Sequence, residues 1–127
     1  MSQLPLLAGV NVLVVSEDPG ANGIYERMLT AIGALVTVAD SVDNALALAA
    51  QLLPDVAIAD LRERGTLRLL LRMRAVAGLS EIPILAVVDA SDGLSVKDGF
   101  NDVLEHPVDR ADLLERVIGL SRRRRFG

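Results

Sequence analysis

Five short, mostly apolar runs constrain this chain more than any other feature of its sequence. They span residues 10–15, 34–39, 54–60, 82–88 and 100–105. Most of them are continuously apolar rather than alternating, which is typical of parallel strands covered on both faces. We therefore expect a parallel sheet lying between two layers of helices.

The connections between the runs carry helical patterns. Apolar residues recur at helical spacing at Ile24, Met28, Leu29 and Ile32, before a stop at Gly33. Further helices are predicted over 42–53, with Ser41 as N-cap, over 64–77, and from Asp109 to about Leu120. The segment 89–99 has room only for a short helix around 94–97, because Gly93 and Gly99 bound it.

This order, strand then helix repeated five times, leaves few topologies when the crossovers are right-handed. The prediction is an α/β, doubly wound, flavodoxin-like sheet of five parallel strands in the order 2-1-3-4-5. Its fourth helix is expected to be shortened or irregular. We expect one domain over 1–127, with a core over about 10–120 and a basic tail over 121–127.

Composition excludes several classes of function. The chain has 127 residues and no cysteine, which removes disulfides, thiolate metal sites and cysteine catalysis. Only 2% of residues are aromatic, so stacking on nucleobases is disfavoured. No apolar run approaches the roughly 18–20 residues of a membrane span, and no signal peptide is evident, so a cytoplasmic location is expected.

The predicted topology gathers polar residues at one crevice. Its switch point lies between the first and third strands, where ligands bind in open α/β sheets. Ser16, Glu17 and Asp60 meet there, with Val88 and His106 at the ends of the fourth and fifth strands. A carboxylate at such a place serves as nucleophile, metal ligand or helix cap.

The layout resembles the receiver (CheY-like) domain of bacterial two-component response regulators, over about Val10 to Leu120. The matching motifs are Glu17-Asp18-Pro19 after the first strand, Pro54-Asp55 before Asp60, Ile82-Pro83, and His106-Pro107 in place of Lys-Pro. The resemblance implies the same fold, with Asp60 at the phosphoacceptor position.

Several chemical positions depart from that family. Two acidic residues hold magnesium there, where this chain has Ser16 and Glu17. Val88 replaces the switch hydroxyl, and Val103 falls where the family has an aromatic ring. His106 replaces the lysine that grips the phosphoryl group, and an unperturbed imidazole is mostly neutral at pH 7. These losses resemble a degenerate receiver, or pseudo-receiver.

The metal at this crevice is expected to be weakly bound magnesium, on Glu17 and Asp60, or absent. Arg62 lies two residues beyond Asp60, and its guanidinium either replaces the metal charge or is solvated. A transition-metal site on Glu17, Asp60 and His106 is a further alternative. The simplest interpretation makes Asp60 a cap and His106 a turn residue.

The leading hypothesis is a non-enzymatic receiver-like module that binds signalling proteins without phosphorylation. Its partners would be a histidine kinase, other receivers or output domains, and a homodimer is left open. The alternative is an atypical response regulator that accepts a phosphoryl group on Asp60. Nucleic-acid contact through Arg122–Arg125 is disfavoured by the acidic body, and a nucleotide enzyme by the lack of a glycine-rich phosphate motif.

Overall fold

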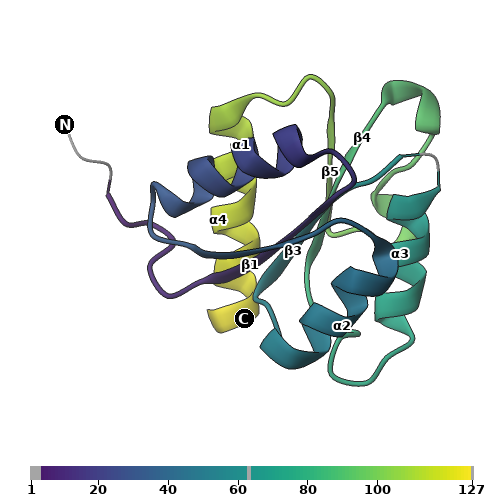
Figure 1. Ribbon diagram of the computed structural model, residues 1–127, viewed down its shortest axis with the longest axis horizontal. Helices are drawn as coiled ribbons and strands as arrows, with labels where there is room; N and C mark the ends of the chain where they lie inside the picture. Colours follow the sequence, from purple (N-terminus) through teal and green to yellow (C-terminus); the bar gives the residue numbers. More distant parts are fainter. Residues whose placement is uncertain (1–3, 63, 127) are drawn as a thin grey trace.

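The computed structural model describes residues 4–62 and 64–126 and shows a parallel sheet between two helical layers (Figure 1). The strands are β1 (Asn11–Ser16), β2 (Leu35–Ala39), β3 (Val56–Asp60), β4 (Ile84–Val88) and β5 (Asp102–Glu105). The helices are α1 (Pro19–Thr30), α2 (Val42–Leu52), α3 (Gly65–Arg74) and α4 (Arg110–Phe126). The strand order is β2-β1-β3-β4-β5, which confirms the predicted topology.

Two helices cover each face of the sheet. Side chains alternate along the strands, so Val12 and Val14 pack under α1 and α4, while Leu13 and Val15 pack under α2 and α3. Figure 1 shows these pairs on opposite sides of the strands. Strand β1 pairs with β3 in a register that sets Ser16 opposite Asp60. The two residues therefore end their strands side by side.

The connection between β4 and β5 holds no full helix. Two 3₁₀ turns, Ala90–Asp92 and Val96–Asp98, replace the helix that the other connections carry. Each turn ends at a glycine with positive φ, Gly93 or Gly99, in a backbone conformation that ordinary side chains rarely adopt. The predicted irregular fourth helix is confirmed: the second turn overlaps the predicted position at 94–97, and the first precedes it.

Helix α1 faces the core, together with the turn after it, through most of the predicted apolar residues, Met28, Leu29 and Ile32, but not through Ile24. It begins at Pro19, because Asp18 accepts a hydrogen bond from the Gly20 N–H and caps it. Its buried residues are Asn22, Tyr25 and Leu29. Ile24, predicted to face the core, is 50% exposed. In the first half of the helix the buried positions are therefore Asn22 and Tyr25 instead of Ile24.

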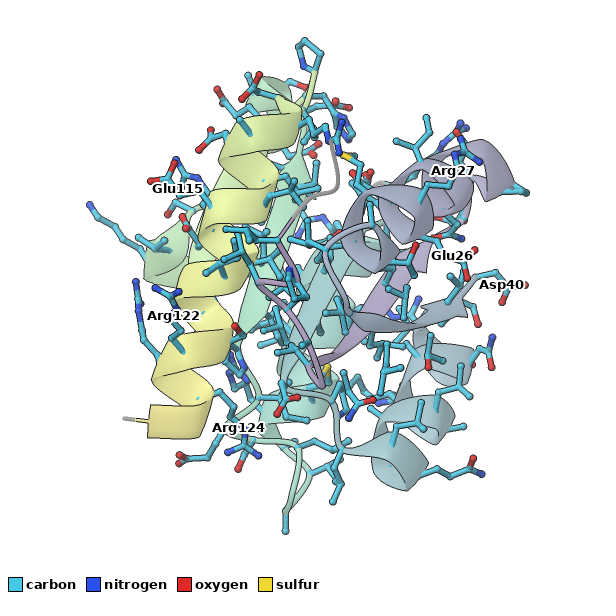
Figure 2. All side chains as sticks on the ribbon, turned by 90° about the vertical axis from the view of Figure 1, so that its left-hand side faces the viewer. Glu26, Arg27, Asp40, Glu115, Arg122 and Arg124 are labelled. Carbon is cyan, nitrogen blue, oxygen red and sulfur yellow. The ribbon has the colours of Figure 1, made fainter. Side chains whose placement is uncertain are left out.

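Some predicted element boundaries were wrong. Strands β3 and β4 begin two residues late, because Pro54 and Pro83 have no N–H for the sheet ladder. Helix α4 continues past Leu120 to Phe126, since arginine is a good helix former. Figure 2 shows Arg122 and Arg124 pointing outward from this last part of α4. The side chain of Arg125 lies outside the described residues. Among the described helices, none is both long and apolar enough to span a bilayer.

Candidate functional site

A polar cavity of about 490 Å³ opens at the carboxyl edge of the sheet. It collects the residues that the topology predicted to meet: Ser16, Glu17, Asp60, Val88 and His106. Arg62, from the loop after β3, also lines it. This is the position where open α/β sheets bind ligands.

The carboxylate of Asp60 is held by two side chains. The Tyr25 hydroxyl donates a hydrogen bond of 2.7 Å to Oδ2, and His106 Nε2 lies 2.9 Å from Oδ1. The Asp60 side chain is only 12% exposed, against 40% for His106. Both oxygens therefore have protein partners, so Asp60 is not a helix cap and His106 is not a free turn residue.

Tyr25 is the residue that the sequence interpretation missed. Burial, followed by the hydrogen bond to Asp60 and the charge of that carboxylate, holds the pKa of Tyr25 far above its ordinary value. The hydroxyl therefore stays protonated and acts as a donor. No pattern in the sequence marked it, because a buried tyrosine needs a partner for its hydroxyl and that partner, Asp60, is brought near only by the fold.

The residues after β1 shape the first turn of α1 instead of facing Asp60. Ser16 is buried, and its Oγ accepts a hydrogen bond of 3.2 Å from the Asp18 N–H. Asn22 donates to the Ser16 carbonyl at 2.8 Å. Asp18 lines the same cavity as Asp60, but its Oδ1 is engaged in capping α1.

Glu17 forms a hydrogen bond with Arg62, but with its backbone N–H and not with its guanidinium. Glu17 Oε1 accepts a hydrogen bond of 3.1 Å from the Arg62 N–H. The Arg62 side chain is exposed and, among the described residues, forms no ion pair with Glu17 or Asp60. Of the two alternatives for Arg62, the structure shows the solvated side chain and not a guanidinium in place of the metal charge. The longer Glu17 side chain reaches past Asp60 to the loop.

Of the two remaining family positions, Val88 lines the cavity, whereas Val103 packs against the core. Val88 is buried and Val103 is half-buried, so neither offers a hydroxyl or a ring to the crevice. Asp89 and Asp92 also line the cavity and are engaged in the first 3₁₀ turn, where Asp92 Oδ2 accepts from the Asp89 N–H at 3.0 Å. These carboxylates add negative charge to the opening.

Comparison with known proteins gives a relative of the whole chain. No family model matches the sequence. A protein of Leptolyngbya boryana, described as an uncharacterized 14.6 kDa protein in the sodA1 3' region, is 32% identical over 117 residues. The match covers 87% of this chain and 89% of that protein. This chain belongs to the same family.

Solved structures with the same fold are response regulator receiver domains. One is a protein of Chloroflexus aurantiacus J-10-fl, provisionally assigned as a response regulator, with 28% identity and a TM-score of 0.79. It covers 88% of this chain and 97% of that one. The chemotaxis protein CheY4 of Vibrio cholerae has 21% identity, a TM-score of 0.79, and covers 89% and 99%. The fold is that of a CheY-like receiver.

The residues of this receiver do not fit the magnesium ion that such domains carry. Magnesium needs several oxygen ligands in a near-octahedral array. Here a buried serine stands at one acidic position, Glu17 is turned to the Arg62 N–H, and both oxygens of Asp60 have partners. Across residues 4–62 and 64–126, no three His, Asp or Glu side chains form a group able to hold a metal. The trio of Glu17, Asp60 and His106 is not assembled.

Proposed function

We propose that this receiver is a non-enzymatic signalling module that works through protein contacts and does not depend on phosphorylation of Asp60. The observation that carries the proposal is the occupation of both Asp60 oxygens, by Tyr25 and by His106. A cytoplasmic location goes with this role.

A phosphoryl group on Asp60 would compete with these contacts. One carboxylate oxygen must direct a lone pair at the phosphorus, and the charge on the phosphoryl group must be neutralised by cations. Breaking the hydrogen bond to Asp60 would leave the Tyr25 hydroxyl buried without a partner, which costs about 1–3 kcal/mol. The opening also carries Glu17, Asp89 and Asp92, whose charges repel an incoming phosphoryl donor.

Signalling proteins are the partners that similar structures suggest. A receiver domain of a signal transduction histidine kinase from Syntrophus aciditrophicus has a TM-score of 0.79 at 19% identity. A receiver-modulated diguanylate cyclase from Pelobacter carbinolicus has a TM-score of 0.78 at 23% identity. By analogy, we propose that this chain contacts a kinase, another receiver or an output domain.

The test is incubation with acetyl phosphate and magnesium, followed by intact-mass measurement. We expect no phosphoryl adduct on the wild-type chain. Asp60→Ala is the site control, and Asp92→Ala is the matched control for an acidic residue of the same opening. A stoichiometric adduct on the wild type and on Asp92→Ala, absent from Asp60→Ala, would contradict the proposal.

The second candidate is a response regulator that does accept phosphate on Asp60. It is supported by the position of Asp60 on the cavity wall, next to Glu17. That function requires magnesium, so a titration with millimolar magnesium, followed by NMR, separates the two. Shifts confined to residues around Glu17 and Asp60 would favour this candidate, and unchanged spectra would favour the phosphorylation-independent module.

A further inference from the structure

A second polar cleft, of about 630 Å³, lies beside the Asp60 crevice. It opens between the first turns of α2 and α3, and three arginines line it: Arg62, Arg64 and Arg68. We name it the arginine cleft after these residues. Arg64 and Arg68 are four residues apart and lie about one helical turn apart on α3. The cleft shares Glu17, Leu61 and Arg62 with the crevice and differs from it by the two further arginines, Arg64 and Arg68.

The three guanidinium groups have no carboxylate partners within the part of the chain that the structure describes. The ion pairs found there join Arg72 to Asp43, Arg116 to Asp102 and Asp112, and His106 to Asp60. All three cleft arginines are exposed. The net charge of the chain is −4, so this group of three positive side chains has the opposite sign to the chain as a whole.

Carboxylates also line the cleft, and each has a partner. Glu17 accepts from the Arg62 N–H, Asp43 lies 3.7 Å from Arg72, and Asp40 accepts from the Asn44 side chain at 3.3 Å. The acidic groups are therefore engaged at the β1 and α2 side. The free donors lie on the α3 side, where an anion would bind.

Contacts hold the described residues on either side of residue 63, at Leu61, Arg62 and Gly65. Glu17 holds the Arg62 N–H, and the buried Thr66 Oγ1 accepts a hydrogen bond of 3.0 Å from the Leu61 N–H. Gly65 packs so closely that a Cβ there would lie 2.9 Å from Leu61 Cβ. These contacts set the backbone positions from which the arginine side chains extend before a ligand arrives, which lowers part of the entropy cost of binding.

We propose that the arginine cleft binds a small molecule carrying at least two phosphoryl groups. Guanidinium groups match phosphate oxygens in two-pronged hydrogen bonds, and two arginines about one turn apart suit two linked phosphates. The volume is within the range of small-molecule sites. No aromatic residue lines the cleft, so recognition rests on the phosphates rather than on a stacked base. The site is independent of the proposed signalling role.

The experiment is a calorimetric titration of the full chain with inorganic pyrophosphate, alongside inorganic phosphate. Arg64→Gln with Arg68→Gln is compared with Arg122→Gln with Arg123→Gln, which removes the same charge at the exposed end of α4. We expect pyrophosphate to bind at least about tenfold tighter than phosphate. The cleft variant should lose about a hundredfold in affinity, and the α4 variant less than about threefold.

Two further measurements make the outcome decisive. Circular dichroism of each variant checks that the fold is kept, which is expected because the substituted arginines are exposed. Asp60→Ala should bind pyrophosphate as the wild type does. The proposal is overturned by the absence of binding at millimolar pyrophosphate, by equal losses in the two double variants, which would mean general attraction only, or by loss of binding in Asp60→Ala.

Discussion

The Tyr25 hydroxyl lies 2.7 Å from Asp60 Oδ2 and donates a hydrogen bond to it, although 35 residues separate the two in sequence. This contact binds α1 to the end of β3. Tyr25 is also the single tyrosine of a chain without tryptophan. Its absorbance and fluorescence therefore report on the environment of this one hydroxyl, which includes the Asp60 carboxylate.

An alkaline titration of Tyr25 absorbance should show the hydroxyl resisting ionisation. Burial and Asp60 raise its pKa, so the folded chain should keep it protonated well above the ordinary value of about 10. In Asp60→Asn the pKa should fall but stay raised, because burial remains. The urea-unfolded chain should titrate at the ordinary value. Ionisation of the folded wild type near pH 10 would refute the contact.

The same pKa shift sets how stability depends on alkaline pH. Below about pH 10, Tyr25 is protonated in both the folded and the unfolded chain. Its ionisation therefore does not change the free energy of unfolding in that range. Above that pH the unfolded chain loses the proton first, so the free energy of unfolding falls by up to about 1.4 kcal/mol per pH unit. Urea unfolding at several pH values should show this fall in the wild type, and Tyr25→Phe should lack it.

At neutral pH, Tyr25→Phe should lower the free energy of unfolding by about 1–3 kcal/mol, because Asp60 loses a donor in a partly buried place. A double-mutant cycle with Asp60→Ala, followed by urea unfolding, should give a coupling of about 1–2 kcal/mol. Thr30→Val is the control, since its hydroxyl bonds within an exposed part of α1, and its effect should stay within about 0.5 kcal/mol. Additive effects of the two site variants would mean that the pair does not interact.

Leu53 offers a stabilising substitution. It ends α2 with φ of 48°, in the left-handed region that favours glycine, and it is 54% exposed. Leu53→Gly should raise the free energy of unfolding by about 0.5–1 kcal/mol, because it relieves backbone strain at little cost in burial. Leu52→Gly, one residue earlier and still helical, should lower it by about 1 kcal/mol. The urea midpoints of the two variants should move in opposite directions.

Replacement by alanine should lower the stability of the fold at Gly65 and raise it at Gly119. A Cβ on Gly65 would lie 2.9 Å from Leu61 Cβ, so Gly65→Ala should displace the loop after β3 and cost about 1–3 kcal/mol. Gly119 lies within α4 with nothing within 4 Å of its built Cβ, so Gly119→Ala should gain about 0.5–1 kcal/mol. Thermal unfolding compares the two. A neutral Gly65→Ala would mean that Leu61 moves aside freely.

The fold could be predicted because its elements carry strong local signals. Continuous apolar runs marked strands buried on both faces, and the strand–helix repeat left one favoured topology. The irregular fourth helix followed from Gly93 and Gly99, both of which adopt positive φ. The end of α4 could not be placed, because a run of arginines continues a helix as well as it forms a free tail.

The site was predicted in position but not in contacts. Counting apolar residues set Ile24 inward, whereas Asn22 and Tyr25 are buried because each finds a polar partner. That partnership depends on tertiary geometry, which a sequence pattern does not contain. Likewise, the sequence placed Glu17 near Asp60, but the rotamer that carries its carboxylate to the Arg62 N–H follows from where the loop lies.

The chain of contacts from Tyr25 through Asp60 to His106 joins α1, β3 and the end of β5 at one edge. Proteins that switch draw their moving segments from the parts of the fold that open most easily. Here that edge is cross-linked, so opening it breaks two hydrogen bonds together. Amide protons at the ends of β3 and β5 should therefore exchange with solvent almost as slowly as those in the middle of the sheet. A partner would meet a surface of one fixed shape.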